Sequence, residues 1–119
     1  MAIMTFELTH GYKAGETTHL EVGLRELTPK DVFDAQMAAE KVGIVNDRPY
    51  AYTSDAHMGM ELLARQVEYI GEIKGPLSVK ELLKLETEDF ALIQSKASEL
   101  DQLLLPQEIM EGVEERGRS

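Results

Sequence analysis

Hydrophobic and polar residues alternate in the first quarter of the chain. Leu20, Val22 and Leu24 are separated by polar or small residues, and a period of two is typical of a strand with one buried face. The segment before it, residues 6–9, is short and mixed, and two glycines between the segments permit a turn. The pattern predicts a β-hairpin over about residues 5–27.

A helix start follows the hairpin. Thr28 can cap free N–H groups, Pro29 suits the first helical position, and Asp31 places a negative charge near the positive end of the helix dipole. These residues predict a helix over about residues 29–41. Its expected core-facing side chains are Val32, Phe33, Met37 and Ala38, with Gln36 as a neighbour.

The next stretch has no regular period. Residues 46–49 read Asn-Asp-Arg-Pro, a turn signal, so we predict a loop from Val42 to Thr53. Tyr50 and Tyr52 lie in this loop. Two tyrosines beside a loop can form a contact surface. More often such side chains pack loosely on the domain, and we favour that interpretation.

A long amphipathic pattern begins after a polar cap at Ser54 or Asp55, and it predicts a helix over about residues 55–73. A second, narrower apolar stripe on this helix consists of Leu62, Tyr69 and Ile73. A helix with two apolar sides either sits between neighbours or offers one side to a partner. The main stripe, with spacings of 4, 3, 4 and 3, is Ala56, Met60, Leu63, Val67 and Ile70.

Two more helices complete the pattern. Ser78 and Glu81 form a capping box that predicts a short helix over about residues 78–85, and a further helix is expected over about residues 88–104. The sequence therefore predicts an α+β fold in one domain, residues 1–105: an N-terminal β-hairpin followed by three to four α-helices packed as a small helical domain. Residues 106–119 are predicted to be a flexible acidic tail.

The charge balance argues against two classes of partner. The chain has 22 acidic and 12 basic residues, a net charge of -10 that is spread along the sequence. Nucleic acids and anionic membrane surfaces attract basic faces, so neither is an expected partner. No apolar run approaches the roughly 20 residues needed to span a bilayer.

No residue pattern points to catalysis or to a cofactor. The chain has no cysteine, and its three histidines form no helical ligand pair. Paired carboxylates such as Glu88 and Asp89 occur at helix starts, where we expect solvated capping groups rather than a catalytic pair. We therefore predict a protein that is not an enzyme and that holds neither a metal nor another cofactor.

The order of elements resembles that of the tail assembly chaperones of Mu-like phages and prophages, over roughly residues 5–103. The residues that carry this resemblance are the approach to the first helix at 24–31, the runs at 63–67 and 73–77, and the segments at 81–83 and 85–90.

The resemblance implies a chaperone that binds the tape measure protein and keeps it soluble in the host bacterial cytoplasm until tail tube subunits polymerise around it. Such a chaperone is absent from the mature virion. The tail tube protein, a frameshifted longer form of the chain and other copies of the chain are further expected partners. The expected client contacts, from the second apolar stripe and the loop, are Tyr50, Tyr52, Leu62, Tyr69 and Ile73.

A different function remains open on the sequence alone. A small acidic phage protein can act as a regulator that inhibits a host protein or a DNA-binding protein. That function would need acidic side chains clustered on one face, and the even spread of charge along the chain weakens it.

Overall fold

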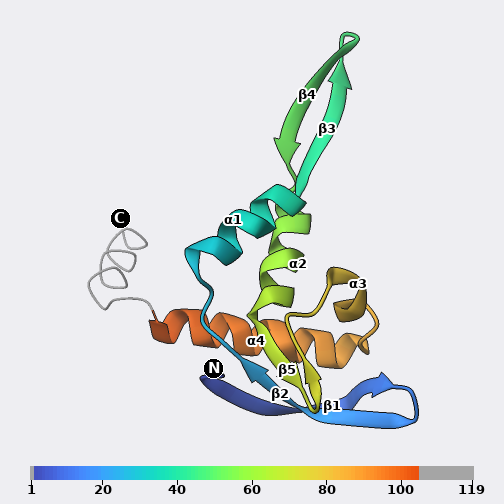
Figure 1. Cartoon of the computed structure of the whole chain (residues 1–119), viewed down its shortest axis with the longest axis vertical. Coiled ribbons are helices and arrows are strands. Elements are labelled where there is room, and N and C mark those ends of the chain that lie inside the picture. Colours follow the sequence, from blue (N-terminus) through green and yellow to red (C-terminus); the bar gives the residue numbers. More distant parts are fainter. Residues whose placement is uncertain (1, 105–119) are drawn as a thin grey trace, which may run out of the picture.

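The computed structural model describes residues 2–104, which contain six strands and four helices (Figure 1). The elements follow the chain in the order β1 (Met4–Ala14), β2 (Thr17–Leu24), α1 (Pro29–Ala38), β3 (Glu40–Val45), β4 (Arg48–Thr53), α2 (Asp55–Gln66), β5 (Val67–Ile70), β6 (Ile73–Lys74), α3 (Val79–Leu82) and α4 (Thr87–Leu104). The predicted acidic tail at residues 106–119 lies outside the described residues.

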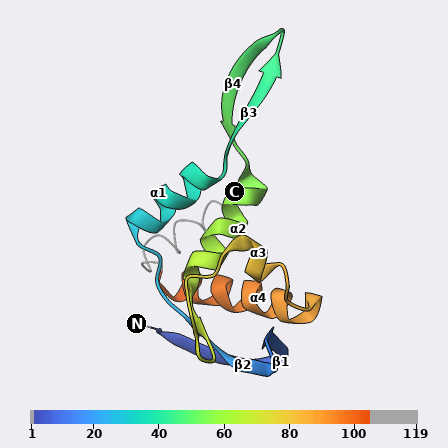
Figure 2. The ribbon, with the colours of Figure 1, turned by 45° about the vertical axis from the view of Figure 1, so that its right-hand side comes forward.

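The N-terminal hairpin belongs to a four-stranded antiparallel sheet in the order β1-β2-β5-β6. The predicted α+β class and the hairpin are confirmed, but the sheet is larger than the hairpin alone. Val22 and Leu24 are fully buried, whereas Leu20 is exposed near the outer part of the hairpin. Both ribbon views show α4 lying across one face of this sheet (Figure 2).

The core lies between this sheet, α2 and α4. On α4 the side chains of Ile93, Ala97 and Leu100 are buried, while Leu104 at the end of the helix is exposed. The remaining buried core residues are Leu8, Tyr12, Val22, Leu24, Leu63, Ala64, Val67, Ile70, Leu77 and Leu82. Burial of these side chains is the main contribution that holds the helices on the sheet.

The prediction of one helix over residues 55–73 is wrong in its second half. The helix ends at Gln66, and the chain continues as β5, a turn at Gly71 and β6. Ile70 pairs with Val22 of β2, and the N–H of Arg25 donates to the carbonyl of Gln66 at 2.9 Å. The apolar spacing suited a helix, but the edge of β2 supplies hydrogen-bond partners that a local pattern does not reveal.

The predicted loop at residues 42–53 is also wrong, because β3 and β4 form a second, two-stranded antiparallel sheet. Asn46 and Asp47 both have positive φ, 51° and 61°. Two such residues between directly paired strands make the tight turn that matches the twist of a hairpin. The helix predicted over residues 29–41 correspondingly ends at Ala38, and the short helix predicted over 78–85 covers only Val79–Leu82.

The predicted core face of α1 is wrong as well. Val32, Phe33, Met37 and Ala38 are all exposed. The side chains that this segment buries are Ala35 and the neighbouring Ala39. Small alanine side chains allow α1 to lie close to α2, so its larger apolar side chains are left on the outer face. The predicted cap is present, since Thr28 and Asp31 form a capping box.

Candidate functional site

The β3–β4 hairpin projects away from the rest of the molecule in both ribbon views (Figures 1 and 2). We call residues 40–53 the arm and the remaining described residues the body. At the base of the arm the N–H of Ser54 donates to the carbonyl of Ala39 at 3.0 Å, which joins the two chain segments that leave the body. The arm is therefore held at one end only.

Both faces of the arm carry exposed apolar or aromatic side chains. Strand register places Val42, Ile44, Pro49 and Ala51 on one face, where Val42 is 72% and Ile44 is 75% exposed. An isolated two-stranded hairpin is at best marginally stable in water. A hairpin that leaves these side chains in solvent is typical of a surface that binds a partner.

The opposite face of the arm carries the two tyrosines. Tyr50 and Tyr52 are both 46% exposed, and their ring centroids lie 5.6 Å apart. A Cβ at Gly43 would lie only 2.7 Å from the Tyr50 ring. Because glycine has no side chain, the Tyr50 ring can lie over the backbone of the paired strand. The tyrosines pack on the arm rather than on the body, and they form part of its exposed surface.

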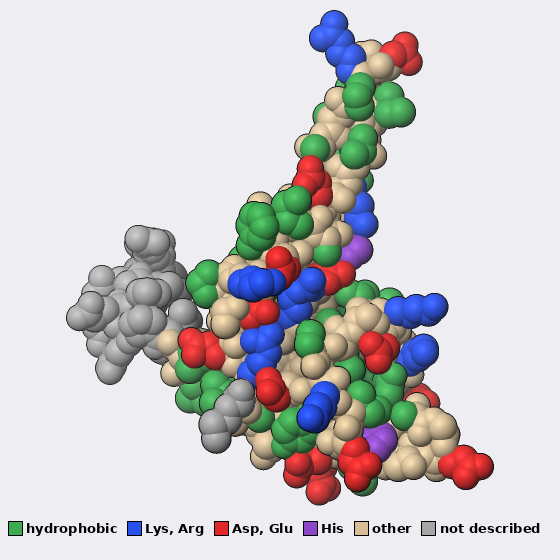
Figure 3. Space-filling view, viewed as in Figure 1, with side chains coloured by type: hydrophobic (Ala, Val, Ile, Leu, Met, Phe, Trp, Pro, Cys, Tyr) green, Lys and Arg blue, Asp and Glu red, His purple; other side chains and the backbone are tan. Residues whose placement is uncertain are grey.

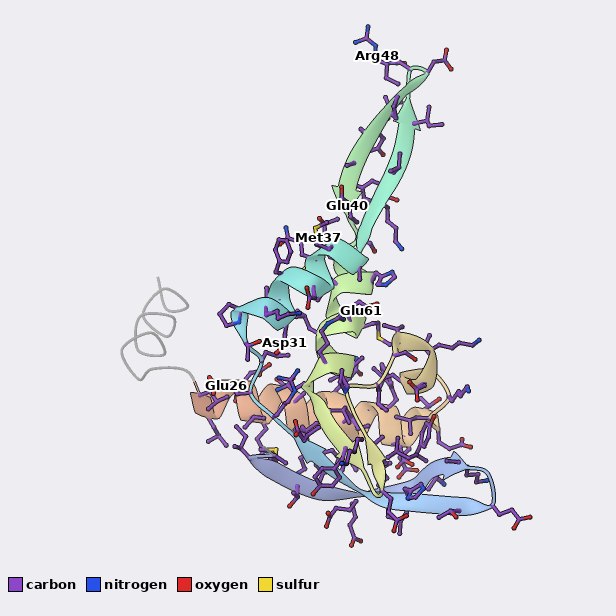
Figure 4. The ribbon with its side chains drawn as sticks, viewed as in Figure 1. Glu26, Asp31, Met37, Glu40, Arg48 and Glu61 are labelled. Atoms are coloured by element: carbon purple, nitrogen blue, oxygen red, sulfur yellow. The ribbon has the colours of Figure 1, made fainter. Side chains whose placement is uncertain are left out.

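The outer face of α1 adds to this surface. Phe33 is 61% and Met37 is 54% exposed, and Val32 is exposed beside them. The space-filling view shows hydrophobic side chains gathered over α1 and along the arm (Figure 3). Met37 lies near Glu40 at the base of the arm, and Arg48 lies at its tip (Figure 4). We call the exposed side chains of Val32, Phe33 and Met37 the α1 face.

Ion pairs fix α1 on the body. The guanidinium of Arg25 donates two hydrogen bonds of 2.8 Å to the carboxylate of Asp31, and it lies 3.6 Å from Glu68. The hydrogen bonds from Arg25, together with those from Thr28, hold the pKa of Asp31 well below its ordinary range. Because this pair is largely shielded from solvent, it sets the orientation in which α1 presents its outer face.

A second ionic cluster lies on α2. Glu61 accepts hydrogen bonds from Arg65 and pairs with His57 at 3.0 Å. Burial raises the pKa of Glu61, but the hydrogen bonds from Arg65 and His57 outweigh that effect, so the pKa is lowered. The cluster keeps these charges on α2 paired with one another.

A groove of about 430 Å³ lies between α2 and α4. Leu62 lines it together with Leu27, Gly59 and Ala97. A Cβ at Gly59 would meet nothing within 4 Å, so this part of the groove is open. At the other side, Gln66 donates a hydrogen bond of 3.1 Å to Asp101, and the groove is therefore partly polar.

The five predicted contact residues lie in three separate places. Tyr50 and Tyr52 are on the arm, Leu62 is in the groove, and Tyr69 and Ile73 are in the sheet. The stripe predicted to join Leu62, Tyr69 and Ile73 on one helix does not exist, because that helix ends before Tyr69.

Tyr69 and Ile73 have structural contacts of their own. The hydroxyl of Tyr69 donates to Glu21 at 2.8 Å, and a Cβ at Gly23 would lie 2.3 Å from its ring, so the ring covers this glycine. The hydrogen bond to Glu21 raises the pKa of Tyr69. Ile73 packs against the core. Replacing either residue by a charged one would disturb the sheet itself.

Sequence reasoning missed the main exposed surface. It placed the α1 face in the core and did not single out Val42 or Ile44. The alternation of Val42 and Ile44 with a glycine and a charged residue, followed by Asn46 and Asp47, is a short-range hairpin signal that could have revealed the arm.

The expected solvated cap at Asp89 is wrong. Asp89 is fully buried, and its carboxylate accepts hydrogen bonds from the N–H groups of Thr9, His10 and Gly11 at 2.7, 3.0 and 2.9 Å. It therefore connects the start of α4 to β1 where the register of β1 with β2 shifts.

Residues 2–104 contain no group of three or more His, Asp or Glu side chains that could hold a metal ion. In the same range every buried side-chain nitrogen or oxygen has a hydrogen-bond partner. No helix within this range is both long and apolar enough to cross a membrane.

The fold and this surface define a small α+β protein that exposes large apolar side chains on an arm and an adjoining helix. Residues 8–118 match the family described as "Tail assembly protein gp41", and the chain belongs to this family. The predicted resemblance to tail assembly proteins of Mu-like phages and prophages is thereby confirmed.

Three relatives show how far the similarity extends. "Probable tail assembly protein gp41" of Escherichia phage Mu is 38% identical over 109 residues, which are 90% of this chain and 73% of that protein. "Mu-like prophage FluMu protein gp41" of Haemophilus influenzae is 37% identical over 110 residues, 92% of this chain and 87% of that protein.

A third relative is longer. "Probable tail assembly protein FS-gp41" of Escherichia phage Mu is 43% identical over 81 residues, which are 66% of this chain and 43% of that protein. No solved structure matches the chain.

Proposed function

We propose that this member of the tail assembly family is a chaperone that holds helical segments of the tape measure protein in solution and catalyses no reaction. The observation that carries the proposal is the exposure of Phe33 and Met37 on a well-anchored helix. A folded monomer gains no stability from apolar side chains left in water, so their presence on one face favours a binding role.

A helix is the client that suits this face. Phe33 and Met37 lie four positions apart along α1, and side chains at this spacing share one side of a helix. Val32 is exposed at the border of the same side. An amphipathic client helix can lay its apolar stripe against this side. The groove that contains Leu62 offers a second contact on the same body.

The charge of the chain suits the same role. A net charge of -10 keeps several loaded copies apart in solution, so a client covered by many copies stays dispersed. Release onto the growing tail requires that each contact be weak, and many weak contacts along one long client still give strong total binding.

Co-expression with the tape measure protein of the same phage tests the proposal. We expect that protein to be soluble only when this chain is present. Phe33→Asp should sharply lower the soluble fraction, because it puts a charge in the middle of the α1 face. Since Phe33 is already exposed, the variant should fold like the parent chain, which circular dichroism would check.

A matched control lies on α4. Ser95→Asp adds the same charge at an exposed helical position that is already polar and lies outside the α1 face, and it should leave the client soluble. The proposal is contradicted if the tape measure protein has the same solubility with and without this chain. Equal losses with Phe33→Asp and Ser95→Asp would contradict the placement of the client on the α1 face.

A further inference from the structure

The arm has one open edge and one blocked edge. Val45 and Arg48 flank the two-residue turn and pair directly, so they form a hydrogen-bonded pair, and such pairs alternate along a hairpin. The N–H groups of Val42 and Ile44 on β3 consequently point outward. Within residues 2–104 no hydrogen bond from another element reaches them.

The equivalent edge of β4 cannot accept a strand in the same way. Pro49 pairs with Ile44 and occupies an outward-pointing position, but proline has no N–H to donate. Proline on an edge strand is one of the ways in which proteins prevent further strand pairing. The edge of β3 has no such block, and Val42 and Ile44 are among the most exposed apolar side chains of the chain.

We propose that β3 pairs antiparallel with β3 of a second copy of this chain, so that two arms form one four-stranded sheet. The two copies would be related by a twofold axis through the middle of β3, a closed arrangement in which each copy uses the same residues. The dimer would bury the open edges and extend each apolar face of the arm. This inference does not depend on the proposed client.

The distribution of charge favours a second copy as the occupant. The arm has two acidic residues, Glu40 and Asp47, and two basic residues, Lys41 and Arg48, so it is neutral in a chain with a net charge of -10. Two bodies repel each other, whereas two arms do not. Glu40 and Lys41 lie at the base of the arm, and Asp47 and Arg48 lie at its tip.

Antiparallel pairing also separates the bodies. Each arm has strands of six residues, about 20 Å at roughly 3.4 Å per residue. Pairing side by side in opposite directions puts the two bodies at opposite ends of the joint sheet, with the tip of each arm near the base of the other. Charges at the tip of one copy then meet opposite charges at the base of its partner.

Sedimentation of the purified full-length chain across a range of concentrations tests the proposal with two matched proline variants. Ile44→Pro removes an outward N–H from β3, and Ala51→Pro removes one from β4. By symmetry, Ile44→Pro deletes two hydrogen bonds of the dimer and should raise its dissociation constant about tenfold or more. Ala51→Pro should leave the dissociation constant nearly unchanged, and circular dichroism would show that both variants fold.

Cross-linking tests the orientation. Because the chain has no cysteine, single variants Val42→Cys and Arg48→Cys can be treated with a short bis-maleimide reagent. Val42→Cys lies near the twofold axis and should give a covalent dimer, whereas Arg48→Cys lies at the tip and should give none.

Four results would overturn the proposal: a monomer at every concentration, equal effects of both proline variants, self-linking through Arg48→Cys, or no self-linking through Val42→Cys. If the arm binds only the client, the purified chain would sediment as a monomer in the absence of that client. That result would count against the dimer.

Discussion

At the scale of single residues, Asp89 shows how one buried carboxylate joins distant parts of the chain. The segment at residues 8–11 of β1 is not paired with β2, and three of its N–H groups turn to Asp89 instead. Charged acceptors form stronger hydrogen bonds than neutral ones, so this contact holds the first turn of α4 on the sheet.

Asp89→Asn should lower the free energy of unfolding by about 2–3 kcal/mol. The amide keeps the shape of the side chain, but it loses the charge and turns an NH₂ group toward buried N–H donors. Urea unfolding followed by circular dichroism measures the change. Glu86→Gln, at an exposed position in the turn before α4, is the control and should change it by less than about 0.5 kcal/mol. Equal effects of both variants would contradict this account.

His10 gives the stability of the same region a dependence on pH. Its Nε2 lies 2.9 Å from Glu88, and this hydrogen bond raises the pKa of His10. Loss of hydration opposes the rise, and the charges of Asp89, Glu88 and Glu86 add to it. A group with a raised pKa in the folded state stabilises the fold fully below its ordinary pKa, about 6.5 for histidine. The stabilisation is lost as the pH rises through the raised value.

Glu88→Gln should therefore destabilise the chain more at pH 5.5 than at pH 8.5. Comparing the two pH values cancels the part of the effect that does not depend on His10, such as the interaction of residue 88 with the helix dipole. Urea unfolding at the two pH values measures the difference. In a His10→Gln background the effect of Glu88→Gln should be the same at both. If Glu88→Gln lowers the stability of the parent chain equally at both pH values, the His10–Glu88 contact is excluded.

At the scale of elements, the sequence predicted those parts whose stability is local. The helix around Ile93, Ala97 and Leu100 and the caps at Thr28 and Ser78 depend on residues a few positions apart, and the structure contains them. The N-terminal hairpin is also local, because its two strands are consecutive in the chain. Periodicity and capping are sufficient evidence for such elements.

The elements that were missed depend on distant partners. Val67 and Ile70 continue the spacing of a helix, yet they form a strand because β2 lies beside them. The α1 face was assigned to the core because large apolar side chains usually lie inside, but Ala35 and Ala39 are buried there instead. No local pattern shows which of two apolar sides of a helix meets a neighbour. The apolar stripe predicted for Leu62, Tyr69 and Ile73 does not form for a different reason, because the helix ends at Gln66, where the chain joins the sheet. The contact role of these residues stays a prediction.

At the scale of the whole molecule, the structure separates neutral and charged parts. The arm has no net charge, while the rest of the chain accounts for the whole of the net charge of -10. An assembly formed through arms would thus hold two like-charged bodies at opposite ends of a joint sheet about 20 Å long. Salt, whose screening length is about 10 Å at 0.1 M, would weaken the repulsion between them. The proposed dimer is held by strand pairing and apolar contact and is opposed by long-range charge.

Because repulsion between the bodies opposes the dimer, the dimer should become stronger as the salt concentration rises. Raising the salt concentration from 0.05 to 0.5 M should lower the dissociation constant by about two- to fivefold, because salt screens the bodies while strand pairing and apolar contacts persist. Sedimentation at both salt concentrations measures the dissociation constant, and that of Ile44→Pro should stay above that of the parent chain at each. A dimer that weakens with salt would instead be held mainly by attraction between opposite charges, such as Lys41 with Asp47 of the partner, and the balance argued for the molecule would be wrong.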